Sequence, residues 1–169
     1  MKGAMMAAAR RRRSSSHRRE GVSRRIVIGM DGSRQASRVV GHVARWAGGG
    51  RATVVRVVEP VRLPSLGLVL PSIRTRLQSA ARAELTARLR AARREVTAAA
   101  ARLRRAGWLA RAVVRVGVPL PQLFRIIREE RANVLALGAS GAGGARRFFL
   151  GSVANGALRR ATIPVLIVP

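Results

Sequence analysis

The strict alternation of short apolar runs with helix-like segments constrains the fold of this chain more than any other feature. Runs that are apolar throughout are typical of strands buried on both faces, as in parallel sheets covered by helices. We therefore predict an open, doubly wound α/β sheet of five parallel strands with helices on both faces. The expected strands span residues 25–30, 52–58, 109–116, 134–137 and 164–168, and the expected helices span 36–47, 73–106, 120–130 and 152–161.

A glycine-rich segment follows the fourth expected strand and leads into the last expected helix. Its spacing is Gly138-x2-Gly141-x9-Gly151-Ser152. The first N–H groups of a helix have no partner within the helix, and its dipole favours negative charge there. Glycines let a phosphate approach the backbone without a Cβ in the way. We interpret the segment as an anion-binding loop, and a tight turn without a ligand is the alternative.

One carboxylate is expected beside this loop. Asp31 directly follows the first strand, and ligands of open α/β sheets bind at the carboxyl ends of the strands, where the strand order reverses. If the first and fourth strands are neighbours, Asp31 and the glycine segment face one crevice. Glu59, after the second strand, is a further candidate for this crevice. The glutamates expected on helix surfaces are Glu84, Glu95, Glu129 and Glu130.

The chain offers little material for catalysis. It has seven acidic residues, two histidines and no cysteine. His17 lies near the N-terminus and His42 on the first expected helix, and neither pairs with a serine and an acid in a nucleophilic arrangement. A Walker A lysine motif and an acidic cluster for a metal are both missing from the sequence. We therefore expect no catalytic residue and no metal held by the protein itself, with slow hydrolysis of a bound nucleotide left open.

The charge of the chain is strongly unbalanced. Thirty-four basic residues stand against seven acidic ones, which gives a formal net charge of +27 at pH 7. Such a charge attracts nucleic acid, acidic lipid and nucleotides, with a strong dependence on salt. The arginines are scattered, however, and only three Phe and two Trp are available to stack on bases. A compositional bias without a binding role is therefore the alternative.

The N-terminal segment differs from the rest of the chain. Residues 1–23 are rich in alanine, arginine and serine, so we expect a disordered basic tail followed by one domain over residues 24–169. The basic cluster is not followed by the apolar region of a signal peptide. No apolar run reaches the roughly eighteen residues that a membrane span needs. We expect a cytoplasmic protein.

Three stretches of the chain resemble the universal stress protein family. They are Ile26–Ser33, the stretch from Gly117-Val-Pro119 to Gly138, and the glycine segment closed by Ile163–Val168. The resemblance covers residues 24–169 and implies strand order 3-2-1-4-5 and a homodimer through the last strand. Because the glycine segment is intact, it also implies the ATP-binding kind of family member, with Mg or Mn accompanying the phosphates.

The resemblance further implies which residues bind the adenosine part of the nucleotide. Asp31 would accept a hydrogen bond from the adenine or ribose side, and the backbone around Val57 would help to read adenine. Gly29 and Gly138 would lie near the ribose, and Met30, between Gly29 and Asp31, is included in the binding set.

A second set of residues is implied for the phosphates. Arg146 and Arg147 would either strengthen phosphate binding or be two further arginines without a role. Asn133 departs from the aspartate that the family often has before the fourth strand. The residues implied to hold the phosphates are Gly141, Gly151, Ser152 and Val153.

These observations leave three functions to compare. The first is an ATP-binding regulatory module of the stress response, acting as a dimer and not as an enzyme. The second is a basic protein that binds nucleic acid or an anionic surface on the same scaffold, with binding that falls steeply with salt. The third is a slow ATPase.

Overall fold

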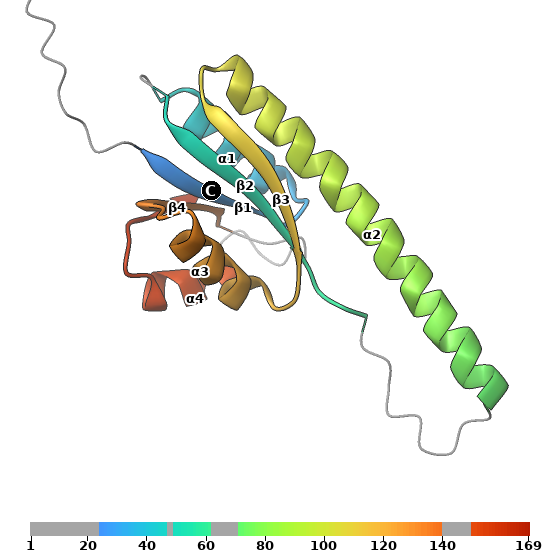
Figure 1. Cartoon of the computed structure of the whole chain (residues 1–169). Helices are drawn as coiled ribbons and strands as arrows, with labels where there is room; N and C mark the ends of the chain where they lie inside the picture. The colour runs from blue at the N-terminus through green and yellow to red at the C-terminus, as the bar shows by residue number, and fades with distance from the viewer. Residues whose placement is uncertain (1–23, 47–48, 62–70, 140–149) are drawn as a thin grey trace, which may run out of the picture.

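Five parallel strands form one sheet with the order β3-β2-β1-β4-β5, as predicted. The computed structural model describes residues 24–46, 49–61, 71–139 and 150–169, so the tail expected at residues 1–23 lies outside the described residues. β1 is the central strand, and β3 and β5 are the two edges (Figure 1). The strands are β1 (Arg25–Met30), β2 (Arg51–Val58), β3 (Leu109–Val116), β4 (Val134–Gly138) and β5 (Val165–Val168).

The helices described by the structure alternate with these strands. One face of the sheet is covered by α1 (Arg34–Ala44) and α2 (Pro71–Arg105), and the other by α3 (Pro119–Glu129) and α4 (Ser152–Arg160) (Figure 1). The predicted boundaries hold to within about three residues. The largest difference is the end of α1, which closes at Ala44 instead of residue 47. None of the described helices combines the length and apolarity needed to cross a membrane.

The central strand shows why successive residues of a strand in the middle of this sheet are apolar. Ile26 and Ile28 point into the hydrophobic cluster under α1 and α2, whereas Val27 points into the cluster under α3 and α4. All three side chains are at most 2% exposed. Because successive strand residues point to opposite faces, a sheet covered on both sides needs apolar residues at every position.

Only the C-terminal half of α2 packs on the sheet. Val96 and Leu103 are fully buried, whereas Ile73 and Leu77 are 45% and 37% exposed. The 35 residues of α2 span about 52 Å, about twice the length of the eight-residue β3 beside it. The N-terminal half of the helix therefore extends past the sheet (Figure 1). Apolar residues recur every three or four positions of α2 from Leu77 to Leu103, but only the second half of this apolar stripe has a core to contact.

Candidate functional site

A pocket of about 670 Å³ lies at the carboxyl ends of β1, β2 and β4. From β1 the chain continues to β2 and β3 on one side of the sheet, and then crosses from β3 to β4 on the other side of β1, so this is the point where the strand order reverses. Asp31 and the described ends of the glycine segment meet here, as the sequence predicted. The predicted residues that line the pocket are Gly29, Met30, Asp31, Val57, Gly138, Gly151, Ser152 and Val153.

Three predicted residues cannot be placed in this geometry. Gly141, Arg146 and Arg147 lie outside the described residues. Glu59, the further candidate carboxylate, does line the pocket. The ligand contact assigned to each lining residue stays a prediction, which the proposed function takes up below.

The loop after β1 holds the Asp31 carboxylate at the pocket wall. Its Oδ1 accepts a hydrogen bond of 2.9 Å from the backbone N–H of Ser33. Ser33 is the N-cap of α1, and its Oγ accepts from the N–H of Ala36 at 3.2 Å. The carboxylate is thereby oriented by the turn that starts the helix. Since an ionised carboxylate has about four acceptor sites, Asp31 keeps capacity to accept hydrogen bonds from a ligand.

The end of β1 has no room for a side chain. A Cβ built on Gly29 would lie 2.5 Å from Cδ2 of Leu137 and 3.5 Å from the side chain of Leu123. Both leucines are buried, and both line the pocket. The glycine thus lets two leucines close over the strand end and form an apolar part of the pocket wall.

The N-terminus of α4 lies at the opposite wall. The N–H of Gly151, its N-cap, donates to the carbonyl of Ala139 at 2.8 Å, which returns the chain to the end of β4. The first bond within the helix runs from Asn155 N–H to the Gly151 carbonyl, and Gly151, as the N-cap, has no side chain to cap the helix. Within the described residues, the N–H groups of Ser152, Val153 and Ala154 therefore have no partner. All three residues line the pocket, where their N–H groups suit an anion.

Two arginines in the pocket wall were missed by the sequence interpretation. Arg56 of β2 forms an ion pair with Glu95 of α2, and its guanidinium lies so close to Gly32 that a Cβ there would collide with it. Gly32 also has a φ of +83°, which favours glycine. The only sequence signal for Arg56 was that it interrupts an otherwise apolar strand. Arg88 of α2 lines the pocket too, and it forms an ion pair with Glu84 one helical turn earlier.

The family can now be assigned. The model of the universal stress protein family matches residues 23–169, which include every described element. The chain belongs to the universal stress protein family. The pocket of this universal stress protein thus lies on a scaffold that the family shares, and the predicted resemblance is confirmed.

Solved structures show the same fold. The universal stress protein UspA from Lactobacillus plantarum has a TM-score of 0.63 at 18% identity, over 86% of this chain and 97% of that chain. A universal stress protein family member from Burkholderia pseudomallei has a TM-score of 0.57 at 28% identity, over 86% and 95%. The universal stress protein from Archaeoglobus fulgidus in complex with dAMP has a TM-score of 0.52 at 20% identity, over 87% and 98%. No curated protein matches the chain significantly in sequence.

Proposed function

We propose that this universal stress protein is a regulatory module that binds an adenine nucleotide, ATP above all, in the pocket at the strand ends. The observation that carries the proposal is the uncapped N-terminus of α4, which shares one pocket with the Asp31 carboxylate. Free N–H groups suit phosphate oxygens, and a carboxylate suits ribose hydroxyl or amino groups. The dAMP complex of the Archaeoglobus fulgidus relative supports the adenine nucleotide class.

The lining residues give the nucleotide a direction in the pocket. In this proposal the adenosine part lies next to Val57 at the end of β2, and the phosphates lie next to Gly151, Ser152 and Val153, which all line the pocket. The described residues contain no group of three or more His, Asp and Glu side chains that could hold a metal ion. A Mg or Mn ion would therefore be bound mainly through the phosphates, whose charge it neutralises.

We propose binding and not turnover as the function, within a cytoplasmic homodimer. Asp31 and Glu59 are the carboxylates among the residues that line the pocket, and neither is paired with a histidine. Regulation by a nucleotide requires that two states of the protein bind it with different affinity. β5 supports the dimer because it is an edge strand, with one side open to pairing with a second copy. Slow hydrolysis of ATP is the enzymatic alternative.

The net charge of +27 supports a second candidate, a protein that binds nucleic acid or an anionic surface. Its affinity would come from arginines over the whole surface and would fall steeply with salt. Nucleotide binding in the pocket depends instead on a few backbone groups at one place. The two functions therefore respond differently to salt and to a local change at α4.

Ser152→Pro tests the proposal because proline at the first helical position removes one N–H group and preserves the helix. Mg-ATP is titrated by calorimetry at about 0.05 and 0.3 M salt into wild type, Ser152→Pro and the control Ser152→Ala, which loses only the hydroxyl. We expect saturable binding that persists in high salt. It weakens about tenfold or more in Ser152→Pro, since a hydrogen bond to a charged group contributes about 1.5–3 kcal/mol.

Two results would count against the proposal. Equal affinity of wild type and Ser152→Pro would show that the α4 N–H groups do not bind phosphate. Affinity that disappears at 0.3 M salt in all three proteins would favour binding by surface arginines. Phosphate release measured on the same samples tests the slow ATPase, and turnover lost in Asp31→Asn would establish it.

A further inference from the structure

Among the described residues, no strand pairs with the outer edge of β3, which borders a groove. β3 is the last strand on its side of the sheet, and α2 runs beside it (Figure 1). Between the two lies a hollow of about 530 Å³. Its lining combines β3 with one stretch of α2, namely Arg111, Ala112, Val113, Val114 and Arg115 with Arg93, Val96 and Thr97.

The hydrogen bonds at the two ends of β3 show which backbone groups point outward. Leu109 N–H donates to Gly50 and Gly117 N–H donates to Val58, at 2.8 and 3.1 Å. In a parallel pair, every second residue bonds the same neighbour, so the odd-numbered residues of β3 face β2. The N–H and C=O groups of the even-numbered residues therefore face away from the sheet.

One of these outward groups already has a partner. The carbonyl of Ala110 accepts a hydrogen bond of 2.8 Å from Nε of Arg104. Within the described residues, the outward N–H and C=O groups of Ala112, Val114 and Val116 have none. Three consecutive pairs of free backbone groups form a template on which another strand can add.

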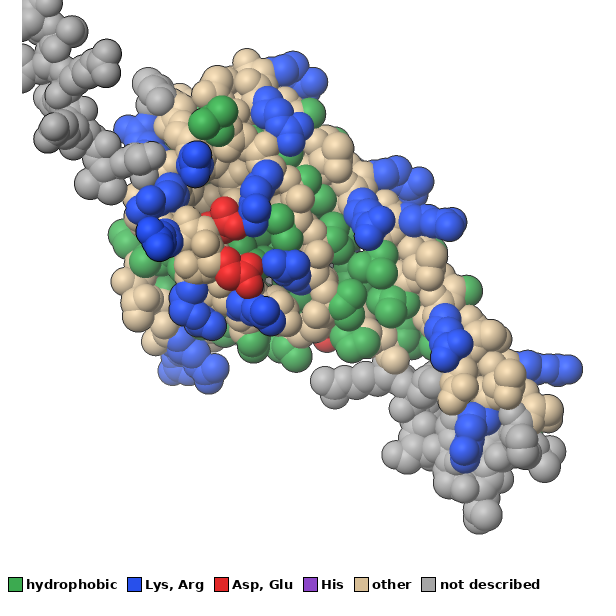
Figure 2. Space-filling model, viewed as in Figure 1, with side chains coloured by type: hydrophobic (Ala, Val, Ile, Leu, Met, Phe, Trp, Pro, Cys, Tyr) green, Lys and Arg blue, Asp and Glu red, His purple; other side chains and the backbone are tan. Residues whose placement is uncertain are grey.

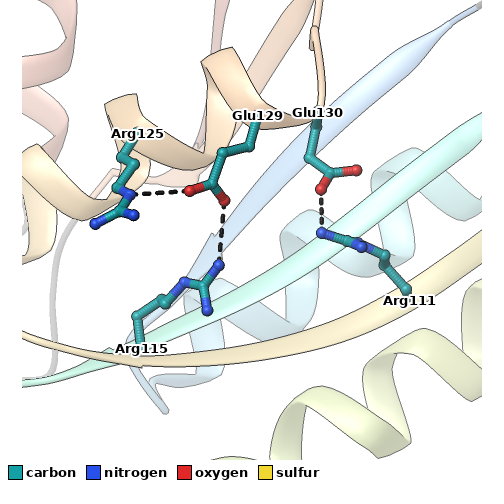
Figure 3. Close-up of polar contacts among 5 residues, drawn as sticks. All are labelled: Arg111, Arg115, Arg125, Glu129 and Glu130. Carbon is teal, nitrogen blue, oxygen red and sulfur yellow. Dashed lines mark hydrogen bonds and ion pairs between the residues drawn. The ribbon is translucent and has the colours of Figure 1, made fainter.

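The two faces of β3 differ in chemistry at this edge. On the α3 side, Arg111 pairs with Glu130, and Arg115 pairs with Glu129 at 3.1 Å (Figure 3). The Arg125 guanidinium, together with Arg115, holds the pKa of the Glu129 carboxyl below its usual value. These carboxylates fix the arginines but do not cover them, since the side chains of Arg111 and Arg115 remain 55% and 42% exposed.

On the α2 side of the same edge the β3 side chains are aliphatic, and Arg93 and Thr97 of α2 border them. Ala112 and Val114 pack against the buried cluster that includes Val96 of α2, and Val116 is 45% exposed. Figure 2 shows apolar surface between β3 and α2 with arginines on both sides of it. Arg93 lines the groove and has no ion pair among the described residues. A strand added here would therefore have Arg111 and Arg115 on one face, and on the other the aliphatic side chains of β3 with Arg93 beside them.

We propose that the outer edge of β3 binds an extended segment of a partner protein in which acidic and apolar residues alternate. The outward groups of Ala112, Val114 and Val116 bond its backbone. Its acidic side chains lie next to Arg111 and Arg115, where opposite charges on neighbouring strands attract. Its apolar side chains, on the other face, enter the groove beside α2. The inference does not depend on nucleotide binding, because the pocket and the groove share none of their lining residues.

Charge argues against two other occupants of the groove. A second copy of the chain paired through β3 would place Arg111 and Arg115 against their own copies, and like charges on neighbouring strands are destabilising. Residues 1–23 carry the same excess of arginine and are disfavoured for the same reason. Nucleic acid would contact the arginines but would not need the outward N–H and C=O groups of β3. The test must therefore separate attraction by charge from backbone pairing.

Binding of labelled peptides to the full-length protein can separate the effect of charge from that of backbone pairing. The probe is an eight-residue peptide of alternating Glu and Val. Its binding is measured by fluorescence anisotropy at two salt concentrations. Two control peptides have the same charge but carry N-methyl groups on either the odd or the even residues. Since only one edge of an added strand faces β3, we expect one control to bind at least tenfold more weakly and the other to bind like the parent. Equal binding of all three peptides would mean that charge alone attracts them and would overturn the proposal.

Val114→Pro gives a second test on the protein side. It removes an outward N–H and leaves the bonds to β2 intact, which is the position in an edge strand where proline is tolerated. We expect at least a tenfold loss of peptide affinity with an unchanged circular dichroism spectrum, and a severalfold loss in Arg111→Gln, which removes a charge next to the acidic side chains. Full affinity in a folded Val114→Pro protein would refute strand addition. If Val114→Pro does not fold, the methylated peptides on the wild type decide.

Discussion

Replacing Leu103 of α2 with alanine tests which part of the long helix is packed on the sheet. Leu103 is fully buried in the cluster between α2 and the sheet. A buried Leu→Ala change loses the transfer free energy of the deleted atoms and leaves a cavity, about 3 kcal/mol together. For a chain of 169 residues, this corresponds to a fall in Tm of about 6–12 °C. Leu77 is the matched control because it belongs to the same apolar stripe of the same helix but is 37% exposed.

The two variants are compared by urea unfolding, followed by circular dichroism. Leu77→Ala should change the free energy of unfolding by no more than about 0.5 kcal/mol, as is usual for surface positions. Equal losses of unfolding free energy in the two variants would refute the conclusion that only the C-terminal half of α2 packs on the sheet. A large loss of unfolding free energy in Leu77→Ala alone would show that the N-terminal half of α2, which extends past the sheet, is covered in solution.

Three further predictions concern single polar contacts. Ser33→Ala removes the side-chain acceptor for Ala36 N–H and should lower the free energy of unfolding by about 1 kcal/mol in urea melts, whereas Ser33→Asp should restore most of it. Asn133→Ala removes the Oδ1 that accepts from the N–H at the start of β1, and a loss of about 1 kcal/mol is expected, with Asn133→Asp as the control that keeps an acceptor. The Glu129 carboxyl, whose pKa Arg125 lowers, stabilises the fold above the unfolded pKa of about 4.3, and this stability is lost as the pH falls through the lower folded pKa. Wild type should therefore exceed Glu129→Gln in stability at pH 7 but not in strong acid, and a constant difference across the titration would contradict this assignment.

The fold could be predicted from the sequence because each element depends on local patterns. Continuous apolar runs marked strands covered on both faces, and Gly107 and Gly117, both with positive φ, lie at the turns on either side of β3. The position of Asp31 after β1 followed from the same logic, since the carboxyl ends of parallel strands meet at one edge. These features require no knowledge of which distant side chains touch.

The features that the sequence did not predict depend on contacts between residues far apart in the chain. Arg56 contacts Gly32 and Glu95, which are 24 and 39 positions away in the chain. No local sequence pattern could therefore predict these contacts. The apolar stripe of α2 has the same periodicity in both halves, but the sequence does not state where the sheet ends. On α3, the neighbouring residues Ile126 and Ile127 are both buried, which depends on the strands and the helix that pack around them.

The alternation of side chains along β1 makes the two sides of the protein one cooperative unit. Ile28 belongs to one hydrophobic cluster and its neighbour Val27 to the other, so the strand cannot leave one cluster without leaving both. Loss of packing at Leu103 should thus lower hydrogen-exchange protection under α3 as well as under α2. The exposed start of α2 contacts neither cluster and can fray on its own. We therefore expect one global unfolding transition, with the start of α2 opening below it.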